Sequence, residues 1–270
     1  MADFNLQFDT LAFTSLDEFA LLACQSYNYG NATDWFGNFR GGLYGFYARQ
    51  LGVATHYHQV HAWVPRPRFP TETEYHLSSI FFNLDSSLEC LTFAFNALGS
   101  AVRPGEFRDV TDSKALKRIT PKDILGEPNA TPPREPLSGY KAIFPSVVAL
   151  WQARVTLIER IIEQHDVSKH RSTIFTGGQT RADPPAGFYE LAGVPDDPLR
   201  RAIFAPMAEI ILKNDLKAPR VSRPVQALSD TILLETVATE FVTLVRDTGV
   251  AVLADVEANI PLAVKSFPQT

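Results

Sequence analysis

Apolar positions recur with a helical period over much of the chain. From Leu77 to Leu98 they step by four and three residues without a break, through Phe81, Leu84, Leu88, Leu91 and Phe95. This spacing places them on one face of an α-helix. Gly99, followed by Pro104, is expected to end that helix. Ile80, Phe82 and Phe93 widen the apolar face, so we predict a core helix that is buried on more than one side.

Three later segments repeat the helical pattern. The first begins near Pro145 and runs to about Glu163. The second covers 198–214, where Pro206 is expected to kink or split the helix because proline lacks a backbone donor. The last covers about 225–258. Each is long enough to contribute to a shared hydrophobic core.

Shorter helices are predicted nearer the N-terminus, and strand signals are weak. Ser15 and Glu18 have the spacing of a capping box, which indicates a helix over 15–26. Another is expected within 33–63. Alternating runs of β-branched residues followed by a turn dipeptide are absent, although "RSTIFTGG" could form a short extended segment.

Proline clusters separate these segments and indicate loops. They lie at 64–70, 126–136, 181–198 and 217–224. The resulting prediction is an all-α fold, an irregular helical bundle with long core helices and proline-rich loops. The core is expected to form around the helices at 74–98, 144–163 and 225–258, within a single mainly helical domain over residues 1–270.

Composition narrows the class of protein. Of 270 residues, 45% are hydrophobic and 20% charged, which is typical of soluble globular domains. A net charge of −5 lacks the basic excess of a dedicated nucleic-acid-binding domain. Neither a secretion signal nor a membrane-spanning stretch is evident, so we expect a cytoplasmic protein without membrane contact. Cys24 and Cys90 lie among apolar residues and are interpreted as buried, reduced thiols.

Two groups of side chains have metal-binding or acid–base potential. His56, His58 and His61 lie close together in "HYHQVH", and three histidines could hold a metal. The favoured interpretation is an amphipathic, partly exposed helix, because that stretch contains no acidic residue and helical metal pairs usually lie four apart. Asp85 and Glu89 do lie four apart.

With His76 and Asn83, this acidic pair could line a cleft and perform acid–base or metal chemistry. The alternative is an exposed helix face, or a contact with a basic residue such as Arg154. Motifs of the form GxSxG, GxxxxGK[ST] and GxGxxG are absent.

The stretch "EQHDVSKHRSTIFTGGQ" (163–179) concentrates basic side chains at the end of the predicted helix that starts near Pro145. They are His165, Lys169, His170 and Arg171. Cations at a helix C-terminus are favoured by the helix dipole, which is a sufficient structural reason for them. The alternative is a reactive or anion-binding cluster, to which Arg154 on the same predicted helix could contribute.

A bundle with a long apolar helix, a polar cluster and then a histidine resembles the HEPN superfamily of helical domains. Active HEPN members carry an Arg, usually a polar residue after it, and a His four to six residues further on. Most are metal-independent ribonucleases, often dimeric. On that motif Gln164 takes the Arg position, His165 the polar position and His170 the catalytic His. The resemblance implies a HEPN-like core over 74–180, with additional helices in 1–63 and 196–265.

Gln164 cannot supply the positive charge that would stabilise a phosphorane. We therefore expect a HEPN-like binding or interaction protein that is catalytically inactive, forms a homodimer, and binds a phosphate-bearing ligand, nucleotide or RNA. His165, Lys169 and Arg154 are the candidate ligand-binding residues. The alternative is a metal-independent ribonuclease that uses His170 and Arg171. Neither metal nor cofactor is expected.

Two further enzyme classes stay open. One is a metal-dependent enzyme using Asp85, Glu89 and the histidines at 56–61. The other is a helical oxygenase whose His-rich helix and aromatic residues, 11% of the chain, would surround a haem.

Overall fold

The computed structural model describes residues 6–26, 32–61, 70–127 except 111, 113, 115 and 116, then 130–170 and 231–262. Within these ranges the chain is all-α, as predicted, and the only β-pairing is an isolated bridge between Glu127 and Arg134. The helices are α1 Leu11–Ser26, α2 Ala32–His61, α3 Pro70–Val102, α5 Lys122–Leu125, α6 Ser138–Ile143, α7 Pro145–Ala153, α8 Val155–His170 and α11 Thr231–Asn259.

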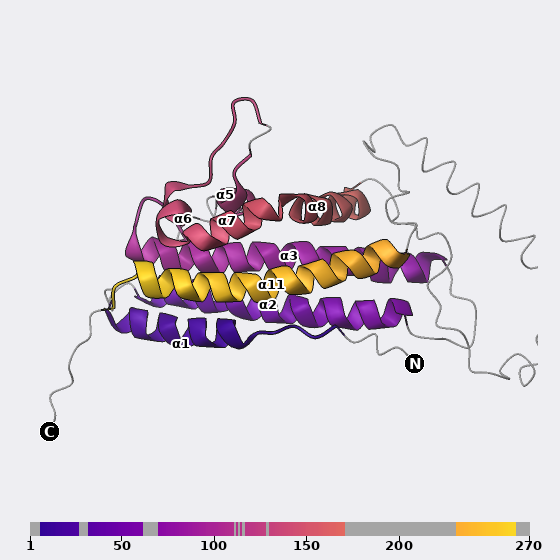
Figure 1. The fold of residues 1–270 in the computed structure, drawn as a ribbon, viewed down its shortest axis with the longest axis horizontal. Coiled ribbons are helices and arrows are strands. Elements are labelled where there is room, and N and C mark those ends of the chain that lie inside the picture. The colour runs from indigo at the N-terminus through magenta and orange to yellow at the C-terminus, as the bar shows by residue number, and fades with distance from the viewer. Residues whose placement is uncertain are drawn as a thin grey trace, which may run out of the picture. The chain divides into compact units, whose positions relative to one another are not determined.

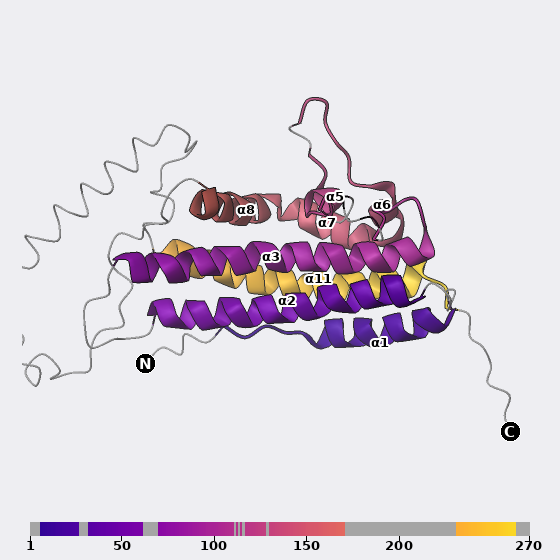
Figure 2. The same ribbon diagram turned by 180° about the vertical axis from the view of Figure 1, so that it is seen from behind.

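The contacts within the chain define two compact units. The first comprises Met1–Leu6, Gly52–Phe82 and Arg160–Thr239, and the second comprises Gln7–Leu51, Asn83–Glu159 and Glu240–Thr270. In the second unit, α1 lies side by side with the parts of α2, α3 and α11 that belong to this unit, and α5, α6 and α7 lie over α3 (Figures 1 and 2). This unit contains most of the aromatic core.

The predicted apolar face of the 77–98 segment forms the interior of α3. Leu77, Leu84 and Phe95 are completely buried, and Leu88 is 1% exposed. Ile80, one of the residues that widens the face, is also completely buried inside the chain. Of the other two, Phe82 is 40% exposed and Phe93 is partly exposed, so the chain itself covers the widened apolar face only in part. The homodimer stays a prediction.

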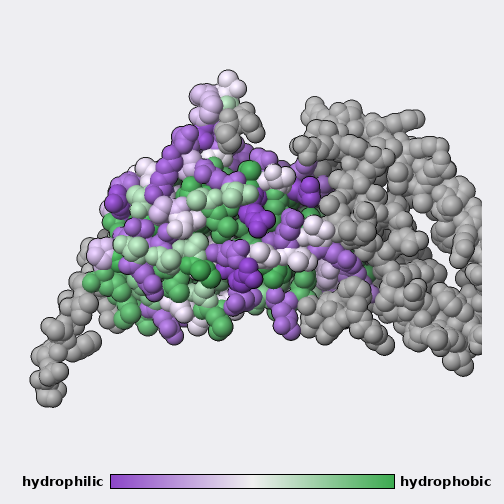
Figure 3. All heavy atoms as spheres, viewed as in Figure 1, coloured by the Kyte–Doolittle hydropathy of each residue, from purple (hydrophilic) through white to green (hydrophobic). Residues whose placement is uncertain are grey.

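The exposed apolar side chains of the second unit lie mainly on α1 and α2. Leu11 is 77% exposed, Leu22 is 52% exposed and Leu51 is 69% exposed. Hydrophobic residues reach the surface along the edge where α1 lies (Figure 3). They are interspersed with polar residues there.

Two predicted helix boundaries were wrong: the start of the first helix at Ser15 and the end of the 77–98 helix at Gly99. The first helix begins at Leu11 instead of Ser15, and the backbone N–H of Leu11 donates to Asp9 Oδ1 at 3.2 Å. Ser15 is therefore inside α1 rather than at its cap. Gly99 does not end α3, which continues to Val102. Its missing side chain instead leaves room for the ring of Phe107.

The helix predicted from Pro145 to Glu163 is interrupted at Arg154, which separates α7 from α8. Arg154 has φ −111° and ψ 17°, and its N–H still donates to the carbonyls of Leu150 and Trp151. The start at Pro145 is confirmed, and α8 extends beyond Glu163 to His170. The predicted 198–214 helix and the "RSTIFTGG" segment lie outside the described residues, and the last helix is described from Thr231.

Gly42 allows the backbones of α2 and α3 to approach each other closely. A Cβ on Gly42 would lie 2.9 Å from both the Ala94 nitrogen and the Cys90 carbonyl oxygen, which are backbone atoms of α3. Its neighbour Gly41 is exposed, and a Cβ there would meet nothing within 4 Å. These two adjacent positions provide a matched test of the helix contact.

We expect Gly42→Ala to lower the free energy of unfolding by about 1–2 kcal/mol, because the clash outweighs the helix-propensity gain. Gly41→Ala should instead raise it, by up to about 1 kcal/mol, because only the propensity gain remains. Urea unfolding of the two variants measures both effects. Equal changes of the same sign would contradict the α2–α3 contact.

Candidate functional site

His165 lies on the buried side of α8. The residue is 8% exposed, and its ring meets the ring of Phe82 from α3 edge-to-face, with centroids 5.4 Å apart and planes at 75°. The Ser168 hydroxyl donates to the His165 carbonyl at 2.9 Å. An imidazole in this position packs the helix against α3, so it is poorly placed to bind a ligand from solvent.

The other residues of the predicted cluster divide between exposed positions and positions outside the described structure. Lys169 and Asp166 are exposed near the C-terminal end of α8. His170 is the last residue of that helix, but its side chain lies outside the described residues, as does all of Arg171. Of the predicted cations at this end of α8, the structure therefore describes one exposed side chain, Lys169.

Arg154 precedes α8, whereas the cluster lies near the C-terminal end of that helix. Arg154 is exposed and lies at the break before α8, whose first residue is Val155. His165 is ten positions after Val155 in the helix, which corresponds to about 15 Å of rise along the axis. Arg154, His165 and Lys169 could therefore contact one ligand only if that ligand extends along α8, and the ligand-binding set stays a prediction.

Replacing the His165 imidazole tests its structural role. We expect His165→Leu to keep the fold, with a loss of at most about 2 kcal/mol, because leucine can fill the apolar contact with Phe82. Binding of RNA, where it occurs, should not change. The control is His58→Leu, at an exposed position of α2, with an expected change within about 0.5 kcal/mol. If His165→Leu keeps the wild-type stability but loses RNA binding, His165 contacts the ligand and its role is not structural.

The acidic pair does not form a common site. Asp85 is 7% exposed and buried on α3, whereas Glu89 is exposed. Asn83 is also buried, and its backbone carbonyl accepts a 2.7 Å hydrogen bond from the Ser87 hydroxyl. Two carboxylates that share a helix but differ in exposure do not present one surface to a substrate. The predicted cleft is therefore not supported by these positions.

The three histidines of "HYHQVH" also point to different environments. His58 is exposed, whereas His61 is 4% exposed and packs on the ring of Tyr57, with centroids 4.5 Å apart. His56 instead meets His76 of α3, and their Nδ1 atoms are 3.0 Å apart. Within the described ranges, no group of three or more His, Cys, Asp or Glu side chains is arranged to hold a metal. The sequence did not reveal the His56–His76 pair because its members are 20 residues apart on two helices.

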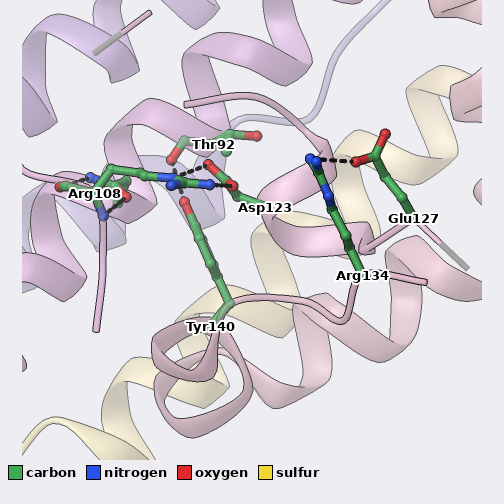
Figure 4. Close-up of polar contacts among 7 residues, drawn as sticks. Thr92, Arg108, Asp123, Glu127, Arg134 and Tyr140 are labelled. Carbon is green, nitrogen blue, oxygen red and sulfur yellow. Dashed lines mark hydrogen bonds and ion pairs between the residues drawn. The ribbon is translucent and has the colours of Figure 1, made fainter. Parts of the chain in front are cut away.

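A polar cluster in the second unit holds the segment after α3 against that helix (Figure 4). The Asn96 amide donates to the Arg108 carbonyl at 2.8 Å, and its oxygen accepts from the Arg108 N–H at 3.0 Å. The Arg108 guanidinium donates to the buried Asp123 carboxylate at 2.9 Å. The Tyr140 hydroxyl donates to the Thr92 carbonyl at 3.0 Å.

This cluster is a structural one. The side chain of Tyr140 is completely buried, and burial raises the pKa of its phenol well above the ordinary value, so the group stays neutral. The other polar atoms of the cluster satisfy one another rather than converging on an open position. Sequence reasoning missed the cluster because these side chains come from four separate segments.

The two cysteines are free, as predicted, although each is partly rather than fully buried. Burial raises the pKa of both thiols. A Cβ on Gly45 of α2 would lie 2.9 Å from Cys90 Sγ, so this sulfur fills space between α2 and α3. Both observations are typical of packing residues rather than reactive thiols.

Comparisons with known proteins found no matching family model, no similar curated protein and no similar solved structure. A search of the described helices for a segment that is long and apolar enough to cross a membrane also found none.

Proposed function

We propose that the chain is a HEPN-like helical binding protein that does not catalyse a reaction at the end of α8. The single observation that supports this most is Gln164 of α8, which occupies the position of the Arg in the HEPN motif and carries no charge. The negative charge of a phosphorane needs a positive charge beside it. His165, in the polar position of that motif, is buried against Phe82 and offers no exposed cation in place of the Arg.

The proposed ligand is a phosphate-bearing molecule such as RNA. Lys169 is exposed near the end of α8, and His170 and Arg171 follow it directly in the sequence. Ammonium and guanidinium groups form strong charge-assisted hydrogen bonds with phosphate oxygens. Gln164, in the position of the HEPN Arg, carries no charge to stabilise a transition state. Binding without cleavage is therefore the activity that these residues favour.

The binding test uses fluorescently labelled single-stranded RNA and anisotropy between about 50 and 200 mM salt. We expect affinity to fall as salt rises, because each phosphate contact releases counterions. The double variant Lys169→Ala, Arg171→Ala should bind more weakly, with a log–log salt slope smaller in magnitude by about 0.7 for each lost contact. Lys141→Ala removes an exposed lysine of α6 and is the matched control. Unchanged binding by the double variant would contradict the proposal, as would no binding at any salt concentration.

A further inference from the structure

The first unit contains a pair of histidines that the proposed function does not use. His56 of α2 and His76 of α3 bring their Nδ1 atoms to 3.0 Å, with ring centroids 5.3 Å apart and planes inclined by 44°. Both residues are partly exposed. Solvent can therefore reach the pair, although two helices hold it.

The ring of Tyr75 contacts both imidazoles. It meets His56 edge-to-face, with centroids 5.7 Å apart at 81°, and also meets His76 at 5.2 Å and 63°. These contacts limit the rotation of both rings. The pair is thus oriented by its neighbours before anything binds, which lowers the entropy lost when a ligand is held.

Two facing Nδ1 atoms at this distance need either a proton on one of them or a metal ion between them. Neutral imidazole carries one N–H and one lone pair, so two rings protonated at Nε2 would direct lone pairs at each other. A proton on one Nδ1 relieves that repulsion, and a metal ion bound by both lone pairs also does so. Burial lowers the pKa of His56, which favours the neutral form that binds metals.

The separation fits a metal ion held in two adjacent coordination positions. Metal–nitrogen bonds of 2.0–2.1 Å across the 3.0 Å gap give an N–metal–N angle of about 94°. Adjacent ligands in tetragonal and octahedral complexes lie near a right angle. A regular tetrahedral angle would need the two nitrogens about 3.3 Å apart. Small movements of the two rings are enough to increase their separation to this distance.

We propose that the Nδ1 atoms of His56 and His76 bind one divalent transition-metal ion of the imidazole-favouring class, Cu²⁺, Ni²⁺ or Zn²⁺. Water fills the other coordination positions, since the described residues supply no third His, Cys, Asp or Glu ligand. A site with two protein ligands holds its metal reversibly. Because the ligands come from α2 and α3, the bound ion cross-links these helices.

The test uses the full-length chain without a histidine tag, treated with chelator and dialysed, then titrated calorimetrically with CuCl₂, NiCl₂ or ZnCl₂ alone. We expect one ion per chain, and a Cu²⁺ electron-paramagnetic-resonance spectrum with hyperfine splitting from two nitrogens. The thermal midpoint should rise by about 3–5 °C when free metal is ten-fold above its Kd. Chelator should reverse that rise.

Three single variants separate this site from other histidines. His56→Gln and His76→Gln should each weaken binding at least about ten-fold and remove the two-nitrogen spectrum, while circular dichroism stays unchanged. His58→Gln, at an exposed position two residues from His56, should bind like the wild type. Lack of binding by the wild type would overturn the proposal, as would binding that survives both of the first two variants or is lost with His58→Gln.

Discussion

Asp255→Ala is expected to lower the free energy of unfolding by about 2–4 kcal/mol, one of the two largest effects we expect. Asp255 is 4% exposed on α11, and its Oδ2 accepts from the N–H groups of Ser146 at 2.9 Å and Val147 at 3.1 Å. These are free donors in the first turn of α7. Phe144 at the N-cap offers no side-chain acceptor, so the cap comes from another helix. Truncation would leave both donors unpaired and remove a negative charge from the helix N-terminus.

Chemical denaturation with circular dichroism measures this loss. Asp255→Asn retains an acceptor and should lose clearly less stability than Asp255→Ala. Glu257→Ala, which removes an exposed carboxylate from the same helix, should change stability by no more than about 0.5 kcal/mol. A loss for Asp255→Ala as small as that for Glu257→Ala would mean that α7 does not depend on this cap.

Gly99→Ala is expected to cost about 2 kcal/mol or more, through overpacking rather than loss of a contact. The Phe107 ring lies between two glycines: a Cβ on Gly99 of α3 would come within 2.6 Å of three ring carbons, and one on Gly139 of α6 within 2.7 Å of three. The ring is 8% exposed and also packs on Tyr140, with centroids 5.0 Å apart. The added methyl would force the ring away from both helices.

A double-mutant cycle isolates this effect from helix propensity. In a Phe107→Leu background, the penalty for Gly99→Ala should shrink, because a smaller side chain can accommodate the methyl. An equal penalty in both backgrounds would contradict the packing of Phe107 on Gly99. A stability gain for Gly99→Ala alone, as expected for an exposed helical glycine, would also contradict it.

The helices that the sequence predicts well are those whose apolar residues repeat over many turns. The period from Leu77 to Leu98 predicted both the helix and its buried face, because burial of that face is what stabilises the element. The start of a helix at Pro145 followed from the fixed φ of proline. Such local signals are read directly from neighbouring residues.

Features that depend on contacts between distant segments were missed. Gly99 looks like a helix stop in the sequence, yet its lack of a side chain makes room for Phe107. Nothing near Pro145 predicts that Asp255, more than 100 residues later, caps its helix. The His56–His76 pair likewise depends on how α2 and α3 meet. These positions have ordinary local sequence, so only the fold reveals their roles.

The predicted cluster at the end of α8 shows the same limit. Lys169 is exposed, as a cation near a helix end would be, but α8 continues through the cluster to His170 instead of stopping at Glu163. Helical geometry then directs His165 toward Phe82 and leaves Arg154 at the other end of α8. The order of basic residues in the sequence does not show which of them are buried and which are exposed. Side-chain direction changes by about 100° with each helical residue, so neighbours in the sequence can point to opposite sides.

The central claim is that the end of α8 binds without catalysing, and RNA cleavage tests it most directly. Labelled single-stranded RNA would be incubated with the wild type and with His170→Ala, with and without chelator, beside a known ribonuclease as positive control. The proposed function predicts intact RNA in every sample except the positive control. Cleavage by the wild type that His170→Ala abolishes, with its circular-dichroism spectrum unchanged, would contradict the claim and identify His170 as catalytic.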